Sequence, residues 1–409
     1  METKYLVSIV SVICIAVIIT VTFTSCSKKW QPKIQNDDEL EEVLKVARNK
    51  FSQPAIGAAL IIGEGNTYKA TSGTYLYKGE KAVDINSRFH IGSTSKTMTA
   101  LLIALLVKEG KLSYETTLFE VLPKTKMLEN YKQVTIHNIL INKAGIIPFQ
   151  LIEKENPKIV KKMWDDIPKL HHNPQQQRVH IVKVALNLKP IVKPGTKVIY
   201  SNVGWVILGH IAELITGIQF ETLLKEKIFN PLRMDSAKVG GWPASKEEPN
   251  QPRGHYFKEK EKRKVISQDL NDEYTFPDWM NPSGGVSLSI TDYAKYAKEH
   301  LLGIQGKGIL LEQVEYEFIH KIHVKARISE MYQSINAKGN ITMGYAWAVV
   351  PVDSKNTLSA ADGSGGTFFA RIIVFPKINA AFAGFSNCGN GNTALDFVIE
   401  KITGLKWGR

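Results

Sequence analysis

Cysteine is scarce in this chain of 409 residues, which contains only Cys14, Cys26 and Cys388. The first two lie in or at the edge of an N-terminal apolar stretch, so one cysteine remains in the body of the chain. A single cysteine cannot form an internal disulfide, which excludes a disulfide-stapled scaffold. The chain is long enough to bury a large core instead, and its hydrophobic content of 44% is ordinary for a globular protein.

Signals for nucleic-acid binding are also missing. The net charge is +13, but we find no zinc-finger spacing, basic zipper or aromatic–basic RNA-binding signature. The basic residues are spread along the chain, and glutamates interrupt the run from Lys258 to Lys264, which is typical of a solvated loop. We therefore expect no nucleic-acid partner, and we expect the charge to favour an anionic envelope surface.

Metal-ligand clusters and repeats are not indicated either. The adjacent His171 and His172 have no further ligands at usable spacing, so a surface pair is the better interpretation. No repeat of fixed period occurs. Length alone is compatible with two or three domains or with one enlarged domain.

Charged residues are absent from Tyr5 to Ser27, directly after Lys4. A run of this length is typical of a secretory signal or of a membrane-spanning helix. The small residues around Cys26 resemble a bacterial lipoprotein signal, in which that cysteine becomes the lipidated N-terminus. An uncleaved N-terminal membrane anchor is the alternative. Both interpretations predict a membrane contact through the N-terminus and place the rest of the chain outside the cytoplasm, in the bacterial cell envelope.

The chain therefore divides into three predicted segments. Residues 1–26 form a leader or anchor, the polar residues 27–36 form a tether, and residues 37–409 form the folded domain. Residues 148–190 are polar and helical in patches, whereas 241–282 form a long excursion of the kind that is usually functional or mobile.

Strand patterns occur at both ends of this domain and helix patterns between them. Predicted strands occupy 55–62, 67–76, 344–350, 367–375 and 380–386. Predicted helices occupy 40–51 behind a capping box at Asn36, then 101–107, 135–141, 204–215, 220–229 and 291–302, with a closing helix capped by Asn392 or Thr393. This order predicts an α+β fold, in which N- and C-terminal strands form one antiparallel sheet flanked by helices, with a mainly helical inserted region.

A serine–lysine motif stands near the start of the domain, at Ser93 and Lys96. It follows a strand-like run and precedes an apolar helix that Gly110 ends, so both side chains are expected on one face of the helix start. A serine hydroxyl needs a base beside it, and a lysine in a dry cleft can lose its proton and act as that base. On spacing alone, a helix N-cap is the more frequent role of such a serine.

Two further motifs lie downstream. Tyr200-Ser-Asn202 is the only Tyr-x-Asn in the chain, and it places a phenol and an amide on one side of an extended turn. The phenol can relay a proton and the amide can hold a carbonyl, although a strand-edge tyrosine with a turn asparagine is by itself the commoner case. Gly363-Ser-Gly-Gly366 is expected to open the strand at 367–375, with glycines that let a substrate lie against the backbone.

Three motifs in this order, with their flanks, resemble the serine β-lactamase and penicillin-binding-protein superfamily. The resemblance is strongest to its branch of class C β-lactamases, DD-peptidases and related esterases. The matching segments are 89–96, 109–112, 134–136, 194–202 and 282–285. The resemblance runs from about Ala55 to about Ile402, so it covers nearly the whole domain and implies the same α+β fold.

The resemblance also implies roles for individual residues. Ser93 would be the nucleophile that forms an acyl-enzyme, Lys96 its base, and Tyr200 a partner in proton transfer. Asn202, Gly363, Ser364 and Gly365 would bind the substrate, and the N–H groups of Ser93 and Gly366 would form the oxyanion hole. No metal or organic cofactor is implied, and the partner would be a small-molecule or peptide substrate, including cell-wall-derived ones.

One position departs from the superfamily pattern. The third motif usually begins with Lys or His, followed by a small residue and Gly, and we interpret Gly363 as that first position. A group that docks a substrate carboxylate is then missing, and Arg371 could replace it only by reaching back from the following strand. The sequence thus predicts an envelope-anchored serine hydrolase acting on an ester, amide or D-amino-acid peptide, with weak β-lactamase activity. The alternative is a penicillin-binding-like envelope protein that binds ligands with little or no turnover.

Overall fold

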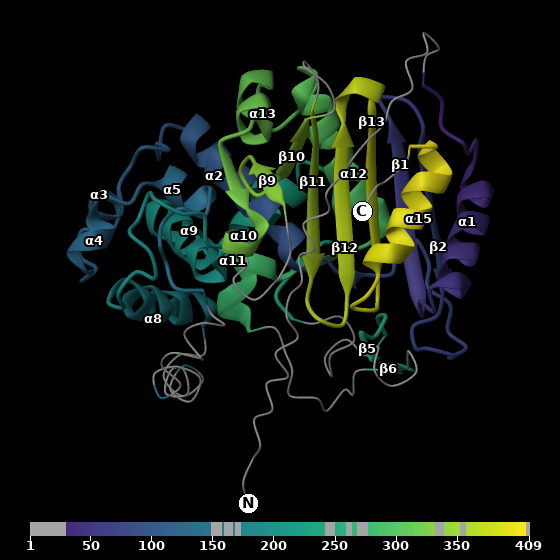
Figure 1. The fold of residues 1–409 in the computed structure, drawn as a ribbon, viewed down its shortest axis with the longest axis horizontal. Coiled ribbons are helices and arrows are strands. Elements are labelled where there is room, and N and C mark those ends of the chain that lie inside the picture. Colours follow the sequence, from purple (N-terminus) through teal and green to yellow (C-terminus); the bar gives the residue numbers. More distant parts are fainter. Residues whose placement is uncertain are drawn as a thin grey trace, which may run out of the picture.

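The structure, a computed structural model, describes residues 30–148, 158, 167, 173–241, 250–258, 264–267, 277–331, 339–351 and 357–405. Within these residues the main sheet has eight antiparallel strands (Figure 1). Their order across the sheet is β2 (Thr67–Gly73), β1 (Ala55–Ile62), β13 (Ala380–Ser386), β12 (Phe369–Phe375), β11 (Thr357–Ser364), β10 (Ala348–Pro351), β9 (Asn340–Met343) and β8 (Val324–Arg327). Because β1 pairs with β13, the predicted α+β sheet built from both ends of the chain is confirmed.

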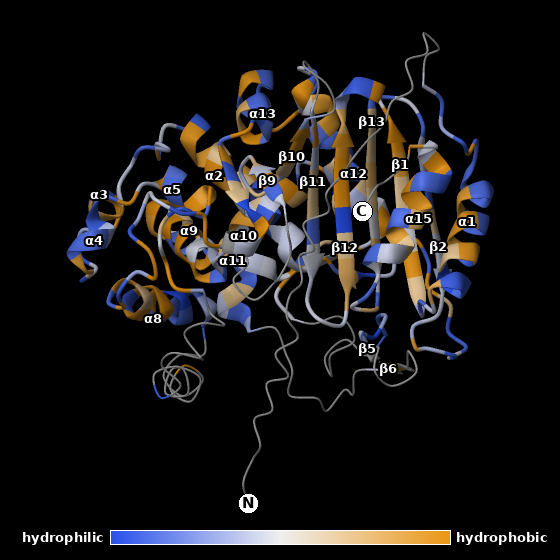
Figure 2. Ribbon diagram, viewed as in Figure 1, coloured by the Kyte–Doolittle hydropathy of each residue, from blue (hydrophilic) through white to orange (hydrophobic). Residues whose placement is uncertain are grey.

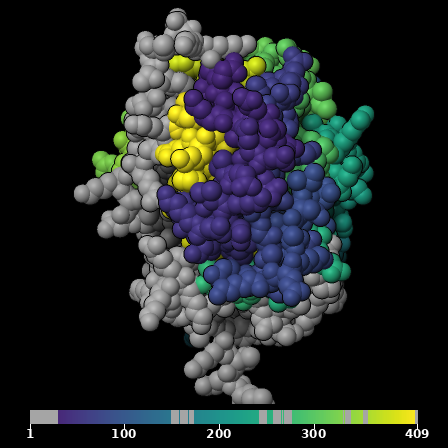
Figure 3. Space-filling model, turned by 90° about the vertical axis from the view of Figure 1, so that its right-hand side faces the viewer, coloured from purple at the N-terminus to yellow at the C-terminus, as the bar shows by residue number. Residues whose placement is uncertain are grey.

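The sheet is covered by helices on both faces. Helices α1 (Asp37–Lys50) and α15 (Asn392–Thr403) lie side by side on one face (Figure 3), and α12 (Ile290–Ile304) packs on the other. Alternate residues of a strand point to opposite faces, so Ile373 of β12 belongs to the core beneath α1 and α15, whereas Ile372 belongs to the larger core. Figure 2 accordingly shows β12, β13 and β1 as mainly hydrophobic, with mixed surfaces on the outer helices.

The helical region adjoins the sheet beyond β9 and β10 (Figure 1). At its centre α2 (Ser95–Lys108) contacts α9, α10 and α11. The remaining helices of this region and of the sheet's edge are α3 (Leu118–Val121), α4 (Glu129–Lys132), α5 (Ile136–Leu140), α8 (Pro174–Leu186), α9 (Asn202–Thr216), α10 (Phe220–Leu224), α11 (Asn281–Gly284), α13 (Gln313–His320) and α14 (Ile328–Met331). Short helical turns are η1 (Gly92–Thr94), η2 (Lys225–Phe229), η3 (Asp278–Met280) and η4 (Pro376–Ile378).

Of the two N-terminal caps that the sequence predicts, the structure confirms one. The Asn36 side chain accepts a hydrogen bond from the Glu39 N–H, which caps α1 as expected. The closing helix differs, because Gly391 rather than Asn392 or Thr393 occupies its cap position and no side chain caps it. The prediction of that cap was wrong because glycine also serves at this position and leaves no side-chain signal.

Two small sheets complete the described fold. The first has the order β3 (Phe89–His90), β7 (Val286–Leu288) and β4 (Lys238–Val239), and the second pairs β5 (His255–Lys258) with β6 (Lys264–Ser267). The predicted excursion at 241–282 therefore contributes a two-stranded hairpin, whose first residue, His255, also accepts a hydrogen bond from the Tyr77 N–H. Most of the run from Lys258 to Lys264 lies outside the described residues. His171 and His172 also lie outside them.

The first described residues differ from the free tether that the sequence predicts. Ile34 is buried beneath α15, the Lys33 N–H donates to Ile402 O at 2.8 Å, and the Trp30 indole donates to Thr403 O at 3.0 Å. The polar composition of 27–36 does not predict these contacts with the body, because they are made mainly by one buried isoleucine and by hydrogen bonds to backbone carbonyls. The chain is therefore fixed to the folded body from Trp30 onward.

Strand β11 is one of several elements that the sequence analysis missed, along with β8, β9 and α13. Its residues are mostly small and lack an apolar alternation, and burial between two neighbours gives the strand its conformation. Gly363 and Ser364 consequently end β11, whereas the prediction made them the opening of the next strand, which begins only at Phe369.

The helices within the described residues are short relative to a membrane-spanning segment. No single helix there is both long and apolar enough to cross a bilayer. The segments Asn202–Thr216 and Phe220–Phe229 meet the length and composition requirements only as a pair, and an 84° bend separates them. The apolar leader and Cys26 lie outside the described residues.

Candidate active site

The position of Ser93 follows from a short strand and a tight turn. β3 pairs with β7, the helical turn η1 follows it, and α2 begins directly afterwards at Ser95. Ser93 is the middle residue of η1, and neither η1 nor α2 has a side-chain cap. The alternative role of Ser93 as a helix N-cap is therefore not what the structure shows, and the hydroxyl is available for other partners.

Two donors converge on the Ser93 hydroxyl. Lys96 Nζ lies 3.0 Å and Tyr200 OH lies 2.8 Å from Ser93 Oγ. Lys96 Nζ also lies 4.9 Å from the centre of the Tyr200 ring, so the three predicted residues form one cluster. Lys96 is only 3% exposed, which keeps its amine away from bulk water. Such an arrangement is suited to removing and relaying the hydroxyl proton.

A backbone carbonyl fixes the lysine. Lys96 Nζ donates to Ser283 O at 2.5 Å, and one turn along α2 the Thr99 hydroxyl donates to Pro282 O at 2.7 Å. Both carbonyls belong to α11, the glycine-containing turn that the sequence singles out. The contribution of the Ser283 carbonyl was not predicted, because a backbone acceptor leaves no residue-type signal.

Tyr200 and Asn202 lie at the start of α9. The Tyr200 N–H donates to Met331 O at 3.0 Å, and the Ser201 side chain caps α9 by accepting from the Gly204 N–H. Asn202 is the first residue of α9 and is 7% exposed. The expected extended turn therefore leads straight into a helix, and its tyrosine reaches Ser93.

Gly363 packs directly against the turn that carries Ser93. A Cβ atom added to Gly363 would lie 2.0 Å from Ile91 O and 2.7 Å from Ser93 N, which are distances that backbone atoms cannot tolerate. The glycine is therefore required by close approach and does not mark a lost docking group. We therefore interpret Gly363 as the glycine in the pattern of Lys or His, a small residue and Gly, which puts the first position at Ala361.

The turn after β11 uses its polar groups internally. Ser364 Oγ donates to Phe368 O and accepts from the Gly366 N–H, both at 3.0 Å. The Gly365 N–H points to Phe368 O at 3.4 Å. Because the Gly366 N–H already has an acceptor, its predicted place in an oxyanion hole does not fit this conformation. Sequence spacing could not reveal that a serine two residues earlier bonds this amide.

Arg371 lies on the opposite face of the sheet from Gly363. Its guanidinium pairs with Asp362 at 2.7 Å and with Asp396 of α15, and the residue is 1% exposed. Burial alone would lower the pKa of Arg371, but the two carboxylates more than offset this and raise it. The suggestion that Arg371 could reach back to a substrate carboxylate is therefore wrong, because that side chain is committed to this pair.

Titratable groups elsewhere do not form an alternative centre in the described part of the chain. No three His, Cys, Asp or Glu side chains in it are grouped so as to hold a metal ion. Cys388 is buried, which raises the pKa of its thiol to about 12 and disfavours the reactive thiolate. The cluster at Ser93 remains the arrangement with clear chemical capability.

Comparison with known proteins gives the same assignment. The sequence profile of the family described as Beta-lactamase matches residues 42–402. A penicillin-binding protein 4 from Amycolatopsis lactamdurans is 25% identical over 376 residues, covering 88% of this chain and 87% of that protein.

Solved structures of similar fold include two enzymes. The first is a class C β-lactamase from Rhodobacter sphaeroides, with a TM-score of 0.65 at 15% identity, covering 89% of this chain and 98% of that one. The second is a D-amino acid amidase from Ochrobactrum anthropi, with a TM-score of 0.65 at 17% identity, covering 89% of this chain and 97% of that one. Because the profile matches most of its length, the chain belongs to the Beta-lactamase family.

Proposed function

We propose that this chain is a serine hydrolase that works through an acyl-enzyme on Ser93. The observation that carries the proposal is the convergence of Lys96 Nζ and Tyr200 OH on Ser93 Oγ, at 3.0 and 2.8 Å. A serine held only for structure has no need of a buried amine and a phenol on the same oxygen. The arrangement matches the requirements of an activated nucleophile with a proton relay.

The proposed reaction has two stages. Lys96, as the free amine, takes the Ser93 proton while Oγ attacks the substrate carbonyl, and Tyr200 helps to pass that proton to the departing alcohol or amine. The carbonyl carbon is then bound to Ser93 as an ester. Water attacks this ester, its proton returns through the same groups, and the acid product leaves. Asn202 would hold the acyl side of the substrate.

The substrate that fits best has an uncharged group next to the reacting carbonyl. Ala361 stands at the first position of the third motif and carries only a methyl group, Gly363 carries none, and Arg371 is tied to two aspartates on the other face. We therefore favour esters and amides, including D-amino-acid amides, over penicillins and peptides with a free terminal carboxylate.

The proposed location is the bacterial cell envelope. The apolar leader and the small residues around Cys26 support export and a lipid anchor, with an uncleaved membrane helix as the alternative. The net charge of +13 favours a site close to anionic envelope polymers.

The decisive experiment is covalent labelling. Separate samples of purified residues 27–409 are labelled with a fluorophosphonate or assayed with a neutral p-nitrophenyl ester, and wild type is compared with Ser93→Ala in both measurements. We expect stoichiometric labelling and ester hydrolysis that the variant loses by several orders of magnitude. Ser113→Ala is the matched control, because Ser113 is exposed and lies beyond the other end of α2. This variant should retain both the labelling and the ester hydrolysis. Labelling that persists in Ser93→Ala would refute the nucleophile assignment.

The same assay addresses the binding-protein alternative and the substrate class. Stoichiometric labelling by a fluorescent penicillin without turnover of any ester or amide would favour a penicillin-binding-like protein. For a neutral-substrate hydrolase, kcat/KM for nitrocefin should be roughly ten- to a hundred-fold below that for the neutral ester, since a hydrogen bond to a charged group contributes about 1.5–3 kcal/mol. Nitrocefin hydrolysis near the diffusional limit would contradict this preference.

A further inference from the structure

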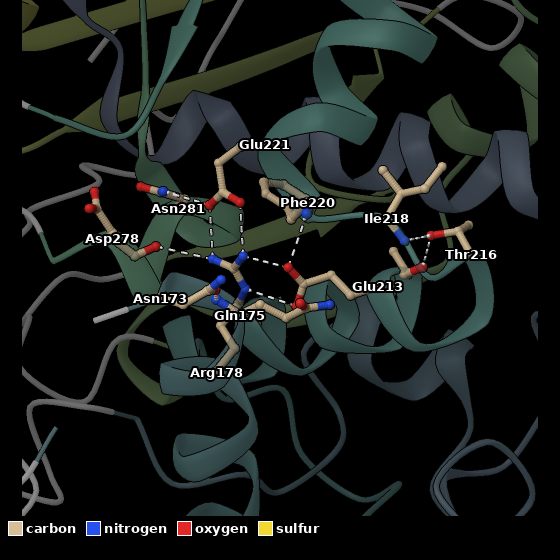
Figure 4. A network of polar contacts seen from close by, with 11 residues as sticks. Asn173, Gln175, Arg178, Glu213, Thr216, Ile218, Phe220, Glu221, Asp278 and Asn281 are labelled. Atoms are coloured by element: carbon tan, nitrogen blue, oxygen red, sulfur yellow. Dashed lines mark hydrogen bonds and ion pairs between the residues drawn. The ribbon is translucent and has the colours of Figure 1, made fainter. Parts of the chain in front are cut away.

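A buried arginine joins α8 to α9, α10 and the turn η3 (Figure 4). Arg178 of α8 is 0% exposed, and its guanidinium contacts two carboxylates. Glu213 of α9 accepts at 2.5 and 3.1 Å, and Glu221 of α10 accepts at 2.9 and 3.0 Å. Burial alone would lower the pKa of Arg178, but the carboxylates more than compensate and raise it, so the guanidinium stays charged.

The network continues from the arginine into α11. Glu221 Oε1, which accepts from Arg178, also accepts from Asn281 Nδ2 at 2.8 Å. Arg178 Nη1 donates to Asp278 O at 3.2 Å, in the turn η3 directly before α11. Asn281 is 1% exposed and is the first residue of α11. The beginning of α11 is thus held by a charged network and not by apolar packing alone.

The same short helix reaches the proposed catalytic cluster. Ser283, two residues after Asn281, offers the carbonyl that accepts from Lys96 Nζ at 2.5 Å. Pro282 between them packs so closely on α9 that a Cβ added to Gly209 would lie 2.2 Å from Pro282 Cγ. There is therefore no free space around Pro282 in which a displacement of Asn281 could be taken up, so such a displacement should also move the Ser283 carbonyl that accepts from Lys96.

We propose that Glu221, held by Arg178, is a positioning residue for Lys96. Through Asn281 it fixes α11 so that the Ser283 carbonyl aims the lysine amine at Ser93 Oγ. The inference rests on the proposed acyl-enzyme function, because Lys96 must act on Ser93 for its placement to affect the rate. A network that only stabilises the helical region would affect the fraction of folded protein and leave the chemistry of each folded molecule unchanged.

The test is the kinetics of acylation by a fluorophosphonate, measured per reactive site. Asn281→Ala removes the hydrogen bond to Glu221 and leaves the arginine and both carboxylates in place. We expect the maximal acylation rate constant to fall roughly ten- to a hundred-fold, the scale of a small misplacement of a reacting group. The probe concentration at half-saturation should stay within about two-fold, because the probe's binding surface is unchanged.

Three further proteins complete the experiment. Glu221→Gln keeps an oxygen that accepts from Asn281 and should retain most of the wild-type rate constant. Glu221→Ala lacks this oxygen and should show the same loss as Asn281→Ala. It also repeats the test if Asn281→Ala fails to fold. Ile181→Ala is the matched control, because it opens a cavity in α8 beside Arg178 without touching the polar network. It should lower Tm and leave the rate constant unchanged.

The possible failures are distinguishable. A rate constant per reactive site that is unchanged in both Asn281→Ala and Glu221→Ala would overturn the positioning role and leave the proposed function standing. A loss as large in Ile181→Ala as in Asn281→Ala would overturn it too, because general loosening of α8 would then suffice. A wild-type protein that never reacts with the probe would overturn the proposed function, and this inference with it.

Discussion

At the scale of single residues, one hydroxyl oxygen collects the functional contacts of the site. Ser93 Oγ accepts hydrogen bonds from both Lys96 Nζ and Tyr200 OH. Removing either donor should therefore disrupt the same proposed path for the hydroxyl proton. Lys96→Met and Tyr200→Phe should each lower kcat/KM for an ester by about 10²- to 10⁴-fold. The double variant should lose little more than the worse single variant, because one unit has already been broken.

Tyr200→Phe is informative because it retains the ring on which Lys96 packs and removes only the hydroxyl. The measurement is a double-mutant cycle on kcat/KM, with Tm recorded for each protein to exclude unfolding. Losses that simply add would argue that the two residues act in separate steps.

Gly363 carries a second prediction at this scale. Gly363→Ala forces a methyl group against Ile91 O, so η1 or β11 must shift. We expect the free energy of unfolding to fall by about 1–3 kcal/mol, the usual cost of overpacking, with acylation slowed in the molecules that fold. Gly65→Ala is the matched control, because its nearest neighbour would lie at an unstrained 3.5 Å. Denaturant titrations that give equal stabilities for both variants would contradict the close approach.

Sequence reasoning reached Ser93, Lys96 and Tyr200 and misjudged Gly363, and the reason is physical. Each motif is weak by itself, but their order along the chain and their flanking residues carry a signal that can be read from the sequence. The need for glycine at 363 arises from contact with a turn about 270 positions away in the chain. The same applies to the Ser283 carbonyl and to the Ser364 hydroxyl that engages the Gly366 N–H.

At the scale of elements, α12 and α13 meet through two buried histidines. His300 Nδ1 and His320 Nε2 lie 2.9 Å apart, and both rings contact Trp347. Burial lowers the pKa of His320 from 6.5 to about 3 and holds that of His300 well below its usual range. In the unfolded chain both titrate near pH 6.5, so the unfolded state binds more protons below that pH.

This difference in proton binding between the folded and unfolded states fixes how the free energy of unfolding depends on pH. Stability that is fully present above pH 6.5 should be lost as pH falls from about 6.5 towards about 3. His320→Gln should flatten the curve of unfolding free energy against pH by at most about 1.4 kcal/mol per pH unit, the contribution of one proton. Urea titrations at several pH values test this, and parallel curves for wild type and variant would refute it.

Element prediction succeeded where a pattern is local and failed where burial is imposed by neighbours. The helices α1, α9 and α12 and the strands β1, β12 and β13 have clear local patterns and lie within a few residues of their predicted bounds, whereas α13 was not predicted. Strand β11 was missed because its small, partly polar residues are extended only through pairing with β10 and β12. Its omission displaced the whole interpretation of the third motif by two positions.

At the scale of the whole molecule, the two ends of the described chain lie together. The Trp30 indole and the Lys33 N–H donate to carbonyls at the end of α15, so the chain is fixed to the body from Trp30. Cys26 precedes Trp30 by four residues, and four residues span at most about 14 Å. A lipid on Cys26 would therefore hold Trp30 within about that distance of the membrane surface, with the end of α15 bound to its indole.

This geometry makes the anchor testable with matched cysteine variants. If Cys26 is lipidated, the wild-type protein should fractionate with membranes and its intact mass should lack residues 1–25, because the leader is cleaved before that cysteine. Cys26→Ser should then accumulate as a precursor that retains the leader, or appear as a released soluble form. Cys14→Ser, a change within the same leader, should leave processing unchanged. A wild-type mass that retains residues 1–25, with identical behaviour of Cys26→Ser, would establish the uncleaved helix as the anchor instead.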